Sequence, residues 1–256
     1  MHRRFVLAAL AAPVVAASWP ARGQAAPIRV LGTGAVAAST RDLAAAFTAA
    51  GGRAVAIATA NAGVAARRLR DGEAADLMLN SATQVARLTA DGLLDGTTTR
   101  ELGRMLIGAA VRDGAPRPDI STEAALRAAI LAAPTIAHSD PSTGATAGTH
   151  AARLIERLGI AEEMRARTLV FPGGGAAVQA VADGRAALAL TQISEIIAVP
   201  GATLVGPLPD AAQLVTPYLG AVTARASDRD GALAFLAFLT GADGRARFRA
   251  AGFATA

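Results

Sequence analysis

Short apolar runs alternate with longer amphipathic segments along most of the chain. Apolar runs bounded by turn residues predict strands, whereas apolar residues spaced three or four apart predict helices. In the first part of the chain, strands are expected at 28–31, 54–60 and 76–79, and helices at 39–50, 63–70 and 81–91. This β-α-β-α-β-α order favours a mainly parallel sheet with helices on both faces.

The alternation continues to a strand expected at 106–111, breaks at Pro116 and Pro118, and then resumes. After the break, the pattern predicts strands at 135–138, 168–171 and 187–191 and helices at 121–132, 147–158 and 176–183. Ser194 is expected to open a short helix. A last segment, from Pro200, carries expected strands at 203–205 and 218–224 and helices at 228–239 and 242–251.

Two α/β units followed by a shorter C-terminal segment predict an α/β protein with two lobes. Each lobe is expected to be a mainly parallel sheet flanked by helices, with a cleft between the lobes. We expect residues 26–110 and 201–256 to form lobe 1 and residues 111–200 to form lobe 2. The last segment then returns to complete the first lobe.

The first 25 residues have the order of a secretory signal. Arg3 and Arg4 form a basic start, residues 5–17 are apolar, and residues 20–25 break the run, with cleavage expected after Ala25. A membrane anchor is the alternative, but the run is shorter than the roughly 20 residues that a helical span needs. We therefore expect a periplasmic protein that loses a signal peptide at 1–25, and the export route stays open.

The composition excludes several classes of protein. With 52% hydrophobic and 18% charged residues, the chain is expected to fold around a core, and without Cys it has no disulfide or thiol chemistry. The formal charge of +5 falls to +2 when Arg3, Arg4 and Arg22 leave with the signal, because 22 cationic residues then face 20 acidic ones. With no basic run and few aromatic residues, nucleic acid is not an expected partner.

Small and hydroxylic residues fill four turns that follow predicted strands, at 32–35, 59–63, 139–146 and 172–175. At such turns the N–H groups of a helix N-terminus point outward and can bind an anion. If each lobe supplies two turns, they face one another across the cleft. The expected ligand-binding residues are Thr33, Gly34, Asn61, Ala62, Gly63, Ser142, Thr143, Thr146, Ala147, Gly173, Gly174 and Gln192.

Each turn has a simpler interpretation, because glycines between a strand and a helix often only form the turn. The turn at Gly32 does not complete a dinucleotide-binding fingerprint, since Ala37 stands where the third glycine is required, and no P-loop occurs. No cofactor is therefore expected. His138 and His150 do not have the spacing of a known metal site, so no metal is expected either.

Catalytic residues are expected only if the protein is an enzyme. The candidates are His138, His150 and Glu195. For each histidine the alternative is a capping or half-buried side chain. For Glu195 the alternative, which the sequence favours, is a carboxylate in the first turn of a helix, where the helix dipole stabilises it.

Several segments resemble the periplasmic binding proteins of the molybdate-binding type. The best are 66–77, Asp140-Pro141 with Ala147-Gly148, and 251–253. The resemblance covers nearly all of the chain after the signal. It implies the type II periplasmic-binding-protein fold, a monomer, and a permease of an ABC transporter as the membrane partner.

The chain departs from that family's pattern at the positions expected to hold the ligand. Two ligand-binding serines of the family fall near Ala35 and near Asn61 or Ala62, and its ligand-binding tyrosine falls at Gln192. The family's second-lobe backbone donors would fall at Ala147 and Gly174. An organic anion is therefore at least as well supported as molybdate.

Three further segments, 118–121, 192–196 and 205–209, resemble a branch that includes exported aconitate isomerase. The expected function is capture of a small anion, an oxyanion or organic carboxylate, for an ABC-type transporter. The alternatives are an isomerase that interconverts cis- and trans-aconitate in the same cleft, and a binding protein that has lost its transporter.

Overall fold

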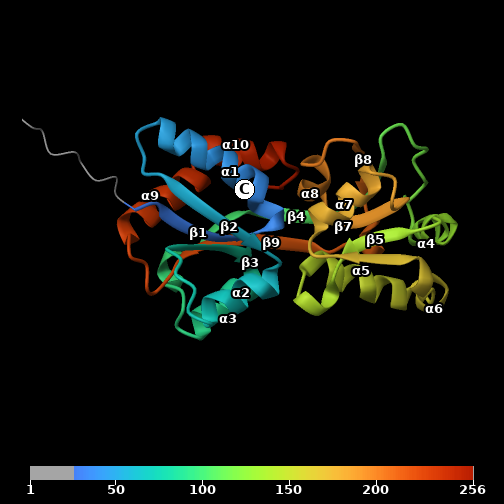
Figure 1. The fold of residues 1–256 in the computed structure, drawn as a ribbon, viewed down its shortest axis with the longest axis horizontal. Coiled ribbons are helices and arrows are strands. Elements are labelled where there is room, and N and C mark those ends of the chain that lie inside the picture. The colour runs from blue at the N-terminus through green and yellow to red at the C-terminus, as the bar shows by residue number, and fades with distance from the viewer. Residues whose placement is uncertain (1–25, 256) are drawn as a thin grey trace, which may run out of the picture.

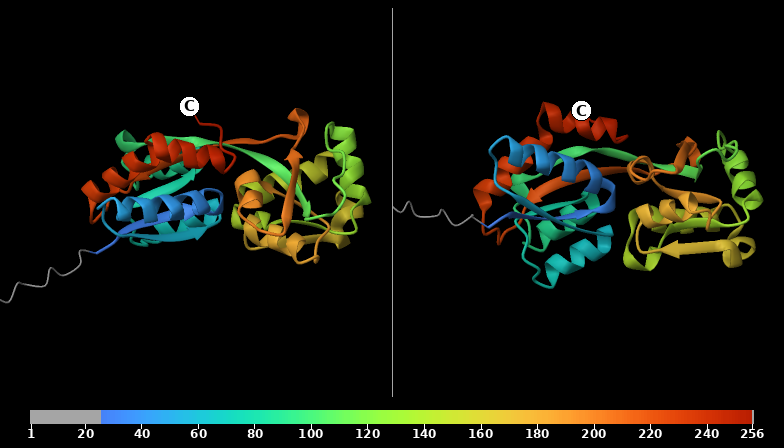
Figure 2. Two further views of the ribbon diagram at one scale, coloured as in Figure 1. Left: turned by 90° about the horizontal axis from the view of Figure 1, so that it is seen from above. Right: turned by 45° about the horizontal axis from the view of Figure 1, so that its top comes forward.

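A computed structural model describes residues 26–255, so the predicted signal segment 1–25 lies outside the described residues. Its strands form one connected set in the order β2-β1-β3-β9-β4-β7-β5-β6, with β8 paired to β4. Two strands, β4 (Arg100–Arg112) and β9 (Val215–Val222), run between the two lobes (Figures 1 and 2).

The first lobe is built on three parallel strands. These are β1 (Ile28–Thr33), β2 (Val55–Ala60) and β3 (Leu77–Ser81), followed in turn by α1 (Gly34–Ala49), α2 (Ala62–Arg70) and α3 (Ala82–Ala90). Strand β9 extends this sheet, antiparallel to β3. Two C-terminal helices, α9 (Arg229–Thr240) and α10 (Ala242–Ala250), return to pack against α1.

The second lobe repeats the parallel arrangement on a smaller scale. Strand β5 (Ile136–Ser139) lies between β6 (Thr168–Phe171) and β7 (Leu188–Gln192) and is parallel to both. Its helices are α4 (Glu123–Ala132), α5 (Thr146–Arg157), α6 (Ala161–Met164), α7 (Gly174–Ala182) and α8 (Ile193–Ile197). The expected type II periplasmic-binding fold is confirmed by this two-lobed α/β arrangement.

Strand β4 changes partners at its middle. Its first half pairs with β9 from Arg100 to Leu106, and its second half pairs with β7 from Ile107 to Ala110. Strand β8 (Ala202–Pro207) also pairs with the second half, although its residues were expected in lobe 1. The exact lobe boundaries stay a prediction.

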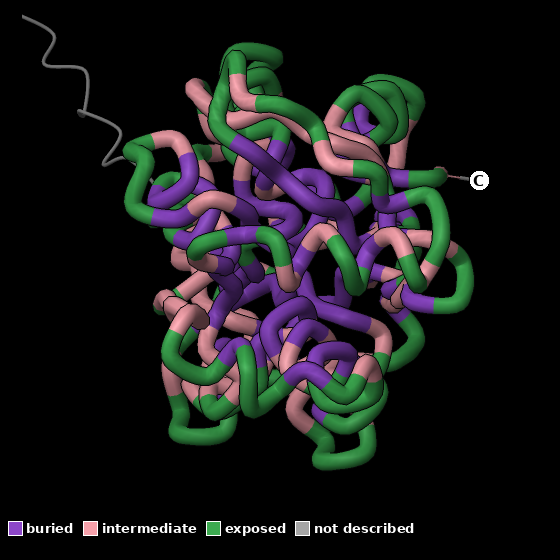
Figure 3. Tube along the Cα trace, turned by 90° about the vertical axis from the view of Figure 1, so that its right-hand side faces the viewer, coloured by how far each residue is buried: buried purple, intermediate pink, exposed green. Residues whose placement is uncertain are grey.

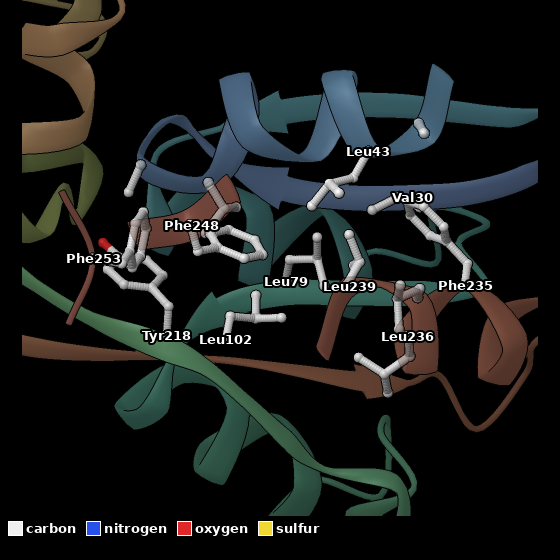
Figure 4. Packing of buried hydrophobic residues seen from close by; sticks show 14 of the residues in the cluster. Val30, Leu43, Leu79, Leu102, Tyr218, Phe235, Leu236, Leu239, Phe248 and Phe253 are labelled. Atoms are coloured by element: carbon white, nitrogen blue, oxygen red, sulfur yellow. The ribbon is translucent and has the colours of Figure 1, made fainter. Parts of the chain in front are cut away.

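The core of the first lobe joins both ends of the described chain. One cluster of buried side chains includes Ile28 from β1 and Phe253 from the C-terminal end. The Phe253 ring packs edge-on against Tyr218 and Phe248, with ring centroids 5.9 and 5.1 Å away (Figure 4). A second cluster, which includes Ile107 and Leu154, lies in the other lobe. Figure 3 shows buried positions gathered inside and exposed positions on the outer turns.

A buried carboxylate fastens the returning C-terminal segment to the first strand. Asp76 is fully buried and accepts hydrogen bonds from the main chain and guanidinium of Arg29 and from the main chain and hydroxyl of Ser227. Burial alone would raise the pKa of Asp76, but these hydrogen bonds hold it well below its usual range. The carboxylate therefore stays ionised and keeps the segment in place.

The helix expected at 39–50 begins five residues earlier, at Gly34. Ser39 and Thr40 look like the start of a helix, but both are buried inside α1, where Thr40 Oγ1 donates to Val36 O at 2.7 Å. The early start brings the helix N-terminus directly to the end of β1. Within residues 26–255, no helix is both long and apolar enough to cross a membrane.

Candidate functional site

A small cavity, here called the central cavity, lies between the two lobes. Both lobes line it, through the starts of α1 and α2 on one side and of α5 and α7 on the other. Its volume is about 20 Å³, which is room for roughly one water molecule. In this arrangement the lobes are therefore closed on one another.

The four helices that start at the central cavity lack side-chain caps. The N-cap residues Thr33, Asn61, Ala145 and Gly173 form no capping hydrogen bond with their own helices. The first N–H groups of a helix have no partner within the helix, and the helix dipole places partial positive charge there. Four such ends around one space form a favourable environment for an anion.

Two helices that begin elsewhere in the molecule do have side-chain caps. Thr122 accepts a hydrogen bond from the N–H of Ala125 in α4, and Asp228 accepts one from Gly231 in α9. A cap of this kind is worth about 1 kcal/mol. The four helices that start at the central cavity lack this stabilisation, and so does α3.

Buried polar atoms along the cavity wall also lack partners. Among the described residues, Thr33 Oγ1 and Gln192 Oε1 are buried without a hydrogen-bond partner. An unpaired buried polar group costs about 1–3 kcal/mol. Thr33 is the more informative of the two, because its hydroxyl can donate to an anion in the cavity.

The carboxylate of Glu195 enters the same cavity from α8. Thr191 Oγ1 donates to Glu195 Oε2 at 2.6 Å, and the N–H groups of Gly174 and Gly175 also donate to the carboxylate. A Cβ atom on Gly34 or Gly174 would overlap a carboxylate oxygen, so these glycines make room for it. Burial raises the pKa of the Glu195 carboxyl above its ordinary value, although the hydrogen bonds oppose the shift.

Tyr218 reaches the cavity from β9, where the sequence did not indicate a site residue. It is the only tyrosine of the chain, its side chain is buried, and its hydroxyl accepts a hydrogen bond from Gln192 Nε2. Burial raises the pKa of Tyr218, so the phenol stays protonated. The one signal in the sequence was the single tyrosine placed on the strand that returns to the first lobe.

Direct hydrogen bonds close the lobes beside the cavity. Asn61 Nδ2 donates to Thr143 Oγ1 and to Pro172 O, both at 2.7 Å, and Gly63 N donates to Gly144 O at 3.2 Å. Both hydrogens of the Asn61 amide are therefore taken by the opposite lobe. In the closed arrangement this amide holds the lobes together and has no hydrogen left for a ligand.

The structure brings most of the expected ligand-binding residues to one place. Those that line the central cavity are Thr33, Gly34, Asn61, Ala62, Thr146, Ala147, Gly174 and Gln192. The others lie beside it: Gly63 and Thr143 in the contacts between lobes, Gly173 in an adjoining pocket, and Ser142 exposed in the turn after β5. Lining residues that were not on the list of expected ligand-binding residues are Ala35, Ser139, Ala145, Glu195 and Tyr218.

Of the three candidate catalytic residues, only Glu195 lines the central cavity. The buried His138 ring uses Nδ1 to contact Ser139 O at 2.9 Å. His150 lies one turn into α5 and uses Nε2 to contact Ala212 O at 2.8 Å. Burial lowers the pKa of His150, and Arg157 and Arg153 lower it further, so the ring is neutral at pH 7.

Two larger pockets adjoin the central cavity, and each shares lining residues with it. The α1–α7 pocket has a volume of about 400 Å³ and shares Gly34, Asn61 and Glu195 with the cavity. The α3–α5 pocket has a volume of about 420 Å³ and shares Thr146 with it. Among residues 26–255, no group of three His, Asp or Glu side chains could hold a metal ion.

A two-lobed α/β fold with a small cavity between the lobes is the architecture of a solute-binding protein. The model of the bacterial extracellular solute-binding protein family matches residues 28–254. The chain therefore belongs to this family.

Individual relatives agree with the family assignment. An aconitate isomerase from a Pseudomonas species is 32% identical over 222 residues, which are 84% of this chain and 83% of that protein. The periplasmic molybdate-binding protein of Azotobacter vinelandii has a TM-score of 0.76 at 18% identity, covering 90% of this chain and 99% of that one. The sulfate-binding protein SubI of Mycobacterium tuberculosis has a TM-score of 0.69 at 17% identity, covering 89% and 86%. The last two similarities concern the fold alone.

Proposed function

We propose that this protein captures a small carboxylate anion between its lobes in the periplasm and delivers it to a membrane permease. The observation that carries the proposal is the convergence of four uncapped helix N-termini, two from each lobe, on one cavity. Each N-terminus offers partial positive charge, so an anion can be held without a full counter-charge. At the start of α7 the N–H groups of Gly174 and Gly175 already donate to Glu195, and at the start of α2 Gly63 N donates to Gly144 O.

A carboxylate suits this cavity better than a tetrahedral oxyanion. Alanine stands at position 35 and at position 62, so neither helix start adds a hydroxyl donor there. Glu195 places a carboxylate in the same space. An inorganic dianion would bring two negative charges beside the Glu195 carboxyl, whereas a single carboxylate group brings one.

Binding requires the lobes to part and close again. The central cavity of the closed arrangement holds little more than a water molecule, so a ligand enters only when the contacts made by Asn61 and Gly63 open. Closure around the ligand is a hinge motion, and β4 and β9 are the two strands that cross between the lobes. The ligand stabilises the closed state because both lobes then contact it.

Thermal unfolding in the presence of candidate ligands tests the proposal. Purified protein is heated with citrate, cis-aconitate, trans-aconitate, molybdate or sulfate, each at the same concentration. A ligand at 100 times its Kd adds about 2.7 kcal/mol to the free energy of unfolding, which raises the melting temperature. We expect a rise with at least one carboxylate. A rise with molybdate or sulfate alone would contradict the proposal.

A second candidate function is isomerisation of aconitate, and Glu195 favours it. A carboxyl group with a raised pKa is a stronger base when ionised, and it lies at the wall of the cavity. The carboxylate would take a proton from the methylene carbon of the bound acid. The double bond would then shift toward that carbon, and the same carboxyl would return the proton to the former vinyl carbon.

A single measurement distinguishes the two candidate functions. The cis/trans ratio of aconitate is followed by ultraviolet absorbance with catalytic amounts of the protein. Turnover that disappears in Glu195→Gln supports the isomerase. Aconitate that binds and is recovered unchanged supports capture alone.

A further inference from the structure

The α3–α5 pocket differs from the other spaces between the lobes in its charge. It lies between α3 of the first lobe and α5 of the second, and it opens beside the central cavity at Thr146. Arg87 of α3 and Arg153 of α5 both line it. Of the described residues that line it, none is acidic.

The two arginines are available for a ligand. Both are exposed, and within residues 26–255 neither guanidinium forms an ion pair or a hydrogen bond. The neutral His150 adds no charge to the pocket, because its ring contacts Ala212 O and its pKa is lowered. The pocket therefore carries two positive charges, one from each lobe.

The start of α3 adds to this positive environment. Its N-cap, Ser81, forms no capping hydrogen bond, and the first residues of the helix line the pocket. The α1–α7 pocket has a similar volume, but it is lined by a single arginine, Arg41, and by the carboxyl of Glu195. An anionic group that extends beyond the central cavity is therefore attracted to the α3–α5 side.

We propose that the α3–α5 pocket binds a second carboxylate of the ligand, so that the captured solute is a di- or tricarboxylate contacted by Arg87 and Arg153. This inference rests on the proposed capture of a carboxylate. The closed central cavity has little space, so it can grip only one anionic group, and the rest of the ligand must lie in a flanking pocket. A carboxylate between the two arginines would touch both lobes and hold them closed.

Calorimetric titration of matched ligands tests the assignment. Tricarballylate, glutarate and butyrate share a short carbon chain and carry three, two and one carboxylates. Hydrogen bonds to charged groups are worth about 1.5–3 kcal/mol, which corresponds to a tenfold or greater change in Kd. We expect Arg87→Gln and Arg153→Gln each to raise the Kd for glutarate and for tricarballylate about tenfold. The Kd for butyrate should change little. Arg41→Gln, in the other pocket, is the matched control and should retain wild-type affinity.

Each outcome has a distinct meaning. Unchanged glutarate and tricarballylate binding in both arginine variants would overturn the assignment of this pocket, and so would butyrate binding to the wild type as tightly as glutarate. Both results leave carboxylate capture standing. If the wild type binds none of these acids and none of the carboxylates tested by thermal unfolding, the proposed function fails and the pocket assignment falls with it.

Discussion

The side-chain amide of Gln192 donates a hydrogen bond to the hydroxyl of Tyr218, and the two residues come from strands of different lobes. Both side chains are buried, and Gln192 Oε1 has no partner among the described residues. The pair therefore links the lobes at the wall of the central cavity. The side-chain N–H group of Gln192 has the Tyr218 hydroxyl as its hydrogen-bond acceptor.

Tyr218→Phe is expected to lower the free energy of unfolding by about 1–3 kcal/mol, since the buried amide of Gln192 loses its partner. The ring still packs against Phe253, so the loss comes from the hydroxyl. Urea denaturation followed by circular dichroism measures the change. The control is the double variant Tyr218→Phe with Gln192→Met, which removes both partners and should recover part of the loss. A single variant as stable as the wild type would contradict this account.

Thr33→Val is expected to weaken carboxylate binding about tenfold or more, because the loss of one hydrogen bond to a charged group costs about 1.5–3 kcal/mol of binding free energy. The unliganded protein should lose no stability, because the Thr33 hydroxyl has no hydrogen-bond partner among residues 26–255. Calorimetric titration with the carboxylate that gives the largest thermal shift measures the effect. Thr33→Ser keeps the hydroxyl and is the control. Equal affinity in the valine and serine variants would exclude a contact from this hydroxyl.

The stability of Glu195→Gln relative to the wild type should increase as the pH rises. The carboxyl has a raised pKa in the folded state but titrates near 4.5 in the unfolded chain. Above pH 4.5 the carboxyl ionises in the unfolded state before it ionises in the folded state. The free energy of unfolding of the wild type therefore falls by up to about 1.4 kcal/mol per pH unit until the folded carboxyl also ionises. Below pH 4.5 the difference between the two proteins becomes constant.

Urea denaturation of both proteins at pH 4, 5.5 and 7 checks this dependence on pH. Thr191→Val, which removes the hydroxyl donor but keeps the carboxyl, is the comparison. A stability difference that does not change with pH would show that the pKa of Glu195 is not raised.

Asp76→Asn is expected to destabilise the protein by about 3 kcal/mol at pH 7, because it leaves the donors of Arg29 and Ser227 facing an amide. The pKa of Asp76 is lowered, so the stability it contributes is present above pH 3.8 and is lost as the pH falls through the folded pKa. Asp91→Asn breaks an exposed pair with Arg70 and should cost at most about 1 kcal/mol. Equal losses in the two variants would contradict the role of Asp76.

The order of elements could be predicted from the sequence because each strand and helix has its own local pattern. The ends of the elements were less accurate where burial overrides local preference. Ser39 and Thr40 are polar and suggested a helix start, yet they lie buried within α1. Strand β4 was expected only at 106–111, because exposed Arg100 and Arg104 interrupt the apolar run in its first half.

The sequence could predict those residues of the candidate site that lie in the turns between strands and helices. Thr33 and Gly174 follow strands, and their place at the cavity comes from the parallel topology alone. Tyr218 could not be predicted in the same way, because its position depends on β9 crossing back between the lobes and pairing with β3. The depth of Glu195 in the cavity depends on the absence of a Cβ atom at Gly34, a contact between residues far apart in sequence.

The core of the first lobe takes residues from the two ends of the described chain, Ile28 and Phe253 among them. During synthesis the ribosome releases the residues of the second lobe well before it releases Phe253. The second cluster can therefore assemble while the first is still incomplete. The first lobe can therefore complete its core only after residues near Phe253 have joined it.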